Sequence, residues 1–396
     1  MARTMGLHKP VKNLNAEDFF ALVAARTEEG QTLDFKLTLP GNSDQEKHEF
    51  RADVTALANT YGGDLVYGIR DEDSVAVEVV GLQLASIDEE VRRIEEMLRS
   101  GIEPSIRGDE LQHIPIPGKG HVLVVRVPRS WAAPHLVKSN SSFRVYGRGV
   151  KRKYPMDAGQ IRSAFSFATD LPERIRDWHR RRVERVAAGE TPVALEAGAK
   201  LILHLVPVSS FMGPESLSAN ELSSRREALQ PFSGSWSTRI NVDGLLSSLI
   251  ISSEKDPHGA YCQVFRSGRV ELVFARLVHT HESQRMIASV SYEMRLIDAV
   301  TNMLRAFGEL RVPPPIFVAM SVRGALGARM GVNPRQAMYF NGHPIDRDEL
   351  DLPDALFERL DDGVPTVLRP VFDALWNACG WERCLNYDNS GKWSSR

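Results

Sequence analysis

The stretch ALANTYGGDLVYGIRD, residues 56–71, decides the fold of the N-terminal part of the chain. Its first residues end a helix that we expect to begin at Ser43, which has the spacing of a capping box. Gly62 and Gly63 permit the left-handed and tightly turned backbone that ends a helix and leads into a strand. The apolar run 65–69 then predicts a buried strand, so the stretch reads as a helix–turn–strand unit.

The same kinds of pattern extend outward from this unit. Apolar spacing and caps predict helices from Asn15, from Ser86 and from Asp157. Alternating or continuous apolar residues predict strands over residues 32–37, 121–127 and 142–146. In 32–37 the alternation predicts one buried face and one polar face. We therefore expect an α/β (α+β) domain with a mixed sheet flanked by helices.

Length and composition predict a second domain and a cytoplasmic protein. The 396 residues suffice for two cores, and a net charge of -2 restricts any nucleic-acid binding to a local patch. Three cysteines are too few for a disulfide framework, and no apolar run is long enough to cross a membrane. We expect domain 1–170, an Arg-rich connecting helix and linker over 171–192, and an α+β domain of unknown role over 193–396.

Acidic residues and one lysine form the most informative set. Asp34 and Lys36 lie two apart on a predicted strand, so their side chains project to the same face. Glu29 precedes that strand, and Asp71 follows the strand after Gly63. If the two strands are neighbours, three carboxylates and an ammonium meet at one edge, an arrangement that suits Mg²⁺ or Mn²⁺ and a scissile phosphate. A solvated strand face with an Asp–Lys pair and a loop aspartate explains the same spacing.

Three motifs of the chain resemble the Schlafen AlbA_2 domain family. EGQTLDFK, residues 29–36, is similar to the E-x4-[ED]-F-K motif of that family. Residues 56–71 resemble its A-N-T-x-G-G block and the strand that follows, with Leu57 where the family usually has Phe. FRVYGR, residues 143–148, and YPMD, residues 154–157, resemble its closing strand and helix start. The resemblance spans residues 15–168.

This resemblance implies a nucleic-acid-binding domain that in animal Schlafen proteins is a metal-dependent endoribonuclease acting on tRNA and rRNA. It places the catalytic residues at Glu29, Asp34, Lys36 and Asp71, with Glu29, Asp34 and Asp71 as ligands of Mg²⁺ or Mn²⁺. Asp34 replaces the more usual Glu and shortens the reach to a metal by one methylene. Many bacterial members are described only as DNA-binding proteins or regulators, so the resemblance supports binding more than cleavage.

Two basic stretches are candidates for phosphate contact. The first has no acidic residue, contains Tyr146 and is followed by Tyr154; its cations are Arg144, Arg148, Lys151, Arg152 and Lys153. Such a patch binds nucleic acid by releasing counterions, and its aromatic residues can stack on unpaired bases. A solvated loop is the alternative. The second stretch, Arg174 to Arg185, contains acidic residues as well and reads as an exposed connecting helix.

Three hypotheses about function follow from these observations. The first is a protein that binds RNA or DNA and hydrolyses structured RNA such as tRNA with a divalent metal. The second is a non-catalytic DNA-binding transcriptional regulator with the same fold, and the third is a protein-interaction scaffold. Since the family's domain often works in pairs and one copy is visible, we also expect a homodimer.

Overall fold

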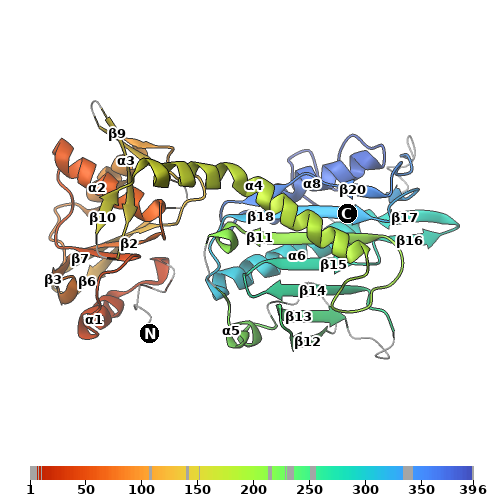
Figure 1. The fold of residues 1–396 in the computed structure, drawn as a ribbon, viewed down its shortest axis with the longest axis horizontal. Coiled ribbons are helices and arrows are strands. Elements are labelled where there is room, and N and C mark those ends of the chain that lie inside the picture. Colours follow the sequence, from red (N-terminus) through yellow and green to blue (C-terminus); the bar gives the residue numbers. More distant parts are fainter. Residues whose placement is uncertain are drawn as a thin grey trace. The chain divides into compact units, whose positions relative to one another are not determined.

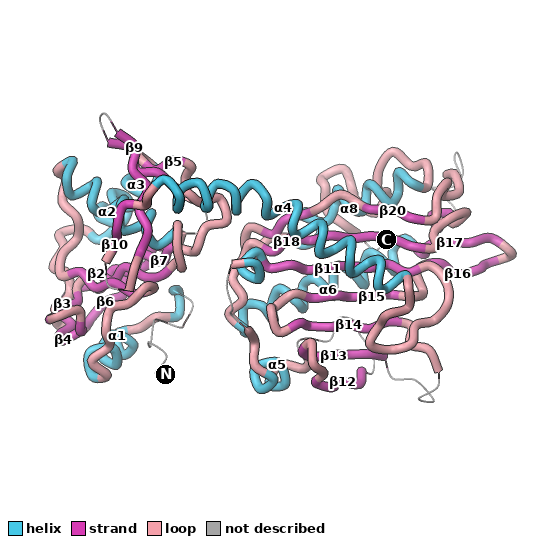
Figure 2. The backbone as a smooth tube through the Cα atoms, viewed as in Figure 1, coloured by secondary structure: helices cyan, strands magenta, loops and turns pink. Residues whose placement is uncertain are grey.

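The computed structural model describes two compact units, Met1–Leu171 and Pro172–Arg396 (Figure 1). Described residues are 7, 9, 11–106, 109–139, 142–150, 152–212, 216–227, 229, 236–249, 256–332 and 342–394. The α+β class and the second domain that the sequence predicts are confirmed, because both units contain helices and sheets (Figure 2).

The N-terminal unit contains short helices and mostly short strands. Its helical elements are η1 (Val11–Asn13), α1 (Ala16–Ala24), α2 (Asp44–Ala58), α3 (Ile87–Arg99) and the start of α4 (Ala158–Ala187). Its first strands are β1 (Leu33–Lys36), β2 (Gly63–Tyr67), β3 (Ile69–Glu72), β4 (Val75–Val79) and β5 (Ile102–Glu103). The later strands are β6 (Glu110–Ile116), β7 (Gly120–Val127), β8 (Leu136–Ser139), β9 (Ser142–Arg148) and β10 (Lys153–Pro155).

One mixed sheet, ordered β1-β2-β7-β6, is buried on both faces. Val66 and Val124 belong to the core cluster that includes residues of α1, whereas Leu65 and Val125 belong to the cluster that includes residues of α2 and α3. Alternate residues of a strand point to opposite faces, so covering both faces requires continuous apolar runs. A second sheet, ordered β10-β9-β8-β5, contacts α2 through β8 and β9.

Helix α2 begins and ends by identifiable interactions. Ser43 caps its N-terminus and forms the predicted capping box with Glu46. Gly62 has a φ of 70°, and a Cβ on Gly63 would lie 2.4 Å from the carbonyl oxygen of Thr32, so both positions need glycine. Asn59 does not cap this turn: its side chain donates to the carbonyls of His135 and Tyr146 and accepts from the His135 amide. It therefore joins the end of α2 to the second sheet.

The C-terminal unit is built around a long sheet ordered β12-β13-β14-β15-β11-β18-β20, with β21 also paired to β18. Its strands are β11 (Lys200–Pro207), β12 (Trp236–Ile240), β13 (Gly244–Leu249), β14 (Ala260–Phe265), β15 (Val270–Phe274), β18 (Ile316–Arg323), β20 (Glu349–Asp351) and β21 (Ala355–Phe357). A smaller sheet contains β16 (Val278–His281), β17 (Gln284–Ala288) and β19 (Arg329–Gly331). The helical elements are the rest of α4, η2 (Val208–Phe211), α5 (Ala219–Ser224), α6 (Ser289–Leu310) and α8 (Val364–Ala378).

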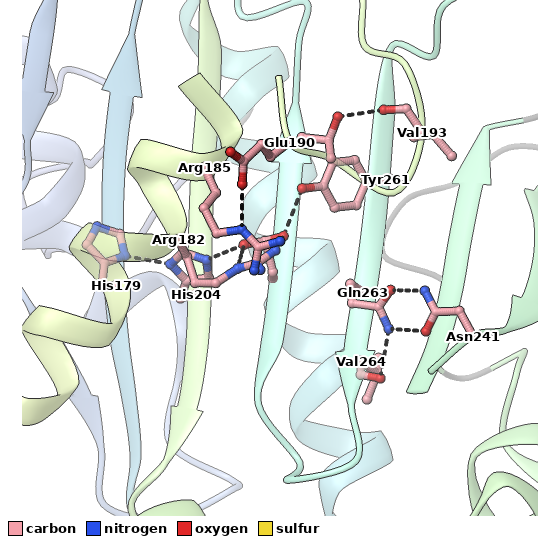
Figure 3. A network of polar contacts seen from close by, with 12 residues as sticks. His179, Arg182, Arg185, Glu190, Val193, His204, Asn241, Tyr261, Gln263 and Val264 are labelled. Atoms are coloured by element: carbon pink, nitrogen blue, oxygen red, sulfur yellow. Dashed lines mark hydrogen bonds and ion pairs between the residues drawn. The ribbon is translucent and has the colours of Figure 1, made fainter. Parts of the chain in front are cut away.

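The Arg-rich segment after Leu171 is helical and continuous with the helix that starts at Ala158. In the C-terminal unit this part of α4 packs on the long sheet through a buried polar network (Figure 3). His179 contacts His204 of β11 at 2.6 Å between their Nδ1 atoms, and Arg182 donates two hydrogen bonds to Glu271 of β15. Tyr261 donates to the same carboxylate at 2.8 Å. The described ranges contain no helix with the length and apolar character that a membrane span requires.

Candidate nucleic-acid interface and the acidic cluster beneath it

The strands that carry the predicted acidic residues are neighbours. β1 pairs in parallel with β2, and Asp34 and Lys36 lie opposite Leu65 and Tyr67. Leu33 and Phe35 point to the α1 side of the sheet, so Asp34 and Lys36 point to the side that α2 covers. The Lys36 ammonium lies 2.7 Å from Oδ2 of Asp34. The shared face that the spacing predicts is therefore present.

That face is not solvated at Asp34, so the alternative explanation of a solvated strand face does not hold there. Asp34 is 4% exposed, and Arg148 of β9 donates to its Oδ1 at 2.8 Å. Burial by itself raises the pKa of Asp34, but the charges of Lys36 and Arg148 outweigh burial and hold the pKa below its ordinary value. Arg148 is itself 3% exposed. It is an internal partner of Asp34 and does not belong to an exposed basic surface.

The Glu29 carboxylate accepts a hydrogen bond from the free edge of the sheet. β1 is an edge strand, and the amide of Phe35 donates to Oε1 of Glu29 at 2.8 Å. Burial raises the pKa of Glu29, the Phe35 amide opposes that rise, and the nearby charges of Asp34 and Asp71 add to it. Glu29 is therefore close enough to interact with each of the other two predicted carboxylates. Asp71 lies at a β-bulge in β3 and has no ion pair with any residue that the structure describes.

A fourth carboxylate, which the sequence analysis missed, lies on α2. Asp53 is 8% exposed and accepts from the Lys153 ammonium at 2.7 Å. Burial raises the pKa of Asp53 even though Lys153 and Lys36 oppose the rise. The sequence contains a signal for this buried carboxylate. Asp53 lies three residues after Phe50 and four before Leu57, so a charged residue interrupts the apolar stripe of the helix.

As placed, the predicted donors do not fit Mg²⁺ or Mn²⁺. Both oxygens of Asp34 already face cations, and one oxygen of Glu29 accepts a backbone amide. A hard divalent ion needs several oxygen lone pairs that converge without competing cations. Among the described residues, no group of three acidic, histidine or cysteine side chains is arranged to hold a metal. The cluster of Glu29, Asp34, Asp53, Lys36, Arg148 and Lys153 is instead charge-compensated from within.

The structure divides the predicted basic patch into internal and exposed cations. Lys153 bridges Asp53 and Glu49, and Arg148 is buried on Asp34. Arg144 and Arg152 are exposed, and neither forms an ion pair with a described carboxylate. Lys151 lies outside the described residues.

Exposed aromatic rings lie on the outer face of the β8–β9–β10 sheet. Phe143 is 63% exposed and Tyr154 is 37% exposed. Phe143 and Gly147 are four residues apart on β9, and Tyr154 pairs with Gly147, so both rings lie on the same face. A Cβ on Gly147 would come within 3.0 Å of the Tyr154 ring, so the glycine gives that ring room. Lys138, opposite Phe143, adds an ammonium to the same face.

The comparison with family models agrees with the motifs. The family model described as "Schlafen, AlbA_2" matches residues 29–157. No curated protein matches the chain. The N-terminal domain of a RecG-related protein from Nitrosomonas europaea is similar at 21% identity over 37% of this chain and 93% of that chain, with a TM-score of 0.27. A Corynebacterium diphtheriae protein is similar at 17% identity over 54% of this chain and 34% of that chain, also with a TM-score of 0.27.

The matched range contains Glu29, the Asp34–Lys36 pair and Asn59, which joins the end of α2 to the second sheet. It also contains the outer face that carries Phe143 and Tyr154. Residues 29–157 of this chain therefore match the Schlafen AlbA_2 domain family, as the sequence motifs predict.

Proposed function

We propose that the N-terminal unit binds nucleic acid at unpaired bases, through the outer face of the β8–β9–β10 sheet. The observation that carries this proposal is the exposure of Phe143 and Tyr154 on one face of that sheet. Large exposed apolar rings are costly to leave in water, and stacking on a base removes their faces from it. Base stacking on aromatic side chains contributes about 1–3 kcal/mol per base and depends little on sequence.

Cations around the rings supply the second part of the proposed interaction. Arg144 follows Phe143 on β9, with its exposed side chain on the opposite side of the strand, and Arg152 immediately precedes β10. Since neither forms an ion pair with a described carboxylate, a bound phosphate would not have to displace an internal partner. Each cation that neutralises a phosphate of a single strand changes the salt dependence of binding by about 0.7 in the log–log slope.

We further propose that this unit binds without metal-dependent cleavage. Asp34 is charge-compensated within the fold, because Arg148 and Lys36 lie 2.8 and 2.7 Å from its two carboxylate oxygens. Purified protein incubated with tRNA and Mn²⁺ should leave the tRNA intact. Cleavage that Asp34→Asn and Asp71→Asn both abolish would contradict this proposal, because it would require these carboxylates to open toward a metal.

Fluorescence anisotropy with labelled oligonucleotides tests binding by the full chain. Phe143→Ala should weaken the binding of single-stranded RNA about tenfold, since one stacking platform is lost. The double variant Arg144→Gln, Arg152→Gln should reduce the salt slope by about 1.4, as expected for two lost phosphate contacts.

Matched controls separate these effects from general changes of the surface. Phe20→Ala removes a ring of α1 that is 43% exposed, and Arg99→Gln removes an exposed arginine of α3. Neither control should change the affinity. Equal binding by Phe143→Ala and wild type would contradict the stacking proposal. Preference for duplex DNA, unaffected by Phe143→Ala, would favour the regulator hypothesis, and no affinity at low salt would favour the scaffold.

A further inference from the structure

Two histidines that the proposed function does not use lie on the smaller sheet of the C-terminal unit. His279 and His281 are two residues apart on β16, so their side chains project to the same face of the strand. Both are exposed, and neither has a hydrogen bond or an ion pair with any residue that the structure describes. Their ring nitrogens are therefore available to a ligand.

A methionine of the neighbouring strand lies beside these histidines. β16 and β17 form an antiparallel hairpin (Figure 1), and Met286 of β17 lies directly opposite His279. Residues that are directly opposite in such a pair share one face, with their Cβ atoms about 4.5–5.5 Å apart. The next residue, Ile287, belongs to the buried core on the other face of the hairpin. The face turned away from the core thus carries two imidazoles and a thioether.

The helix that follows the hairpin contributes a second thioether. α6 begins at Ser289, directly after β17, and Met294 lies in its second turn. Met294 is 43% exposed, which is a large fraction for an apolar side chain. Both methionines and both histidines line one hollow of about 560 Å³. Side chains of β16, β17 and α6 therefore converge on a shared space.

These four side chains have the chemistry of ligands for a soft metal ion. Thioethers select Cu(I), and imidazole also binds copper well. Hard ions such as Mg²⁺ and Ca²⁺ need carboxylate or other oxygen ligands instead. No acidic side chain is among the described residues that line the hollow, so the carboxylates that hold a hard ion are lacking there.

The start of α6 distinguishes between ions of different charge. Ser289 and Ser291 of its first turn line the same hollow, and no side chain caps this end of the helix. The helix dipole places partial positive charge at this end, which opposes a cation more strongly as the charge of the ion increases. A soft monovalent ion is therefore favoured over Cu²⁺ and Zn²⁺.

We propose that His279, His281, Met286 and Met294 form a binding site for Cu(I) on the C-terminal unit. The two histidines alone supply too few ligands for a specific site. The hairpin and the start of α6 bring the two thioethers to them, and sulfur is the ligand type that distinguishes Cu(I) from the divalent ions that imidazole also binds. This site does not depend on the nucleic-acid interface of the N-terminal unit.

Competition with a coloured chelator measures the Cu(I) affinity of the full chain. The anaerobic complex of Cu(I) with bicinchoninate should lose its colour as protein is added, up to one ion per chain. Met286→Leu conserves side-chain volume, and His279→Ala removes an imidazole. Each should weaken Cu(I) binding by more than about tenfold, since even the loss of a partner behind a ligand weakens metal binding about 10–100-fold.

Matched controls separate coordination from general changes of the surface. Thr280→Ala changes the opposite face of β16, and Met156→Leu removes a partly exposed thioether of the N-terminal unit. Both should bind Cu(I) like wild type. Circular dichroism melting of each variant verifies that it folds.

Nuclear magnetic resonance of isotope-labelled methionine methyl groups gives a second readout. Cu(I) is diamagnetic, so the methyl signals remain visible in the loaded protein. The signals of Met286 and Met294 should shift when Cu(I) is added, and that of Met156 should stay. Unshifted signals of Met286 and Met294 would overturn the proposal, as would equal Cu(I) affinity of wild type and the double variant Met286→Leu, Met294→Leu. Zn²⁺ binding as tight as that of Cu(I) would also overturn it, in favour of a site made by the imidazoles alone.

Discussion

Replacing Arg148 with methionine should destabilise the N-terminal unit by about 3 kcal/mol. The substitution keeps an unbranched apolar chain but leaves the Asp34 carboxylate, 4% exposed, without the cation on its Oδ1. Removing one partner of a buried ion pair costs about 3–5 kcal/mol, because the other charge stays buried. Lys36 remains 2.7 Å from the second oxygen, so we expect the lower end of that range.

The pH dependence of this loss has a definite sign. In the wild type, the pKa of Asp34 is held below its ordinary value by Lys36 and Arg148 against burial. The pair therefore stabilises the fold above the unfolded pKa of about 3.9, and this stabilisation is lost as the pH falls through the folded pKa. In Arg148→Met, burial prevails and the pKa of Asp34 rises. Protonation then relieves the buried charge, so the difference from wild type should narrow as the pH falls from 7 to 4.

Hydrogen–deuterium exchange of the β1 peptide measures the local opening free energy in the full chain. A double-mutant cycle with Asp34→Asn isolates the pair, and we expect a coupling of about 2 kcal/mol or more. Arg70→Met is the control: Arg70 pairs with Glu78 at 3.0 Å, but both side chains are largely exposed, so it should cost less than about 1 kcal/mol. A coupling below about 0.5 kcal/mol for Arg148 and Asp34 would refute the reasoning and make Asp34 available to a metal.

Three further predictions concern buried polar groups elsewhere in the chain. Burial, and then the neighbouring His204, lower the pKa of His179 to about 3. The stability that neutral His179 contributes is therefore complete above about pH 6.5, and the free energy of unfolding should fall by about 2 kcal/mol between pH 6.5 and pH 5. Denaturant titration at both pH values should show a smaller fall for His179→Asn. Equal losses would contradict this. Glu293, fully buried, accepts from two indoles, one of them Trp393. Glu293→Gln should cost about 2–4 kcal/mol, and proteolysis should reach the Trp393 segment first; an unchanged digestion pattern would count against it. Asn59→Ala should destabilise the N-terminal unit by about 2–3 kcal/mol, measured by thermal melting, since the Tyr146 carbonyl loses a donor. A loss below about 0.5 kcal/mol would show that the Asn59 side chain does not hold the end of α2 to the second sheet.

Local patterns were sufficient to predict the elements and the class of the fold. Ser43 and Glu46 form their capping box, and Gly62 adopts the left-handed backbone, because caps and turns depend on residues that are neighbours in the chain. The same is true of the common face of Asp34 and Lys36, which follows from the two-residue period of a strand.

Only the tertiary structure decided what surrounds those residues. Arg148 lies 114 positions from Asp34 in the chain, and Lys153 lies 100 positions from Asp53, so no local spacing predicts these pairs. Arg144 and Arg148 lie four residues apart on the same side of β9, but only Arg148 contacts the buried Asp34 carboxylate, so Arg148 is buried and Arg144 is exposed. Charge type is a property of the residue and can be taken from the sequence. Whether that charge is compensated depends on distances that folding sets, and this decides which cations remain for a ligand.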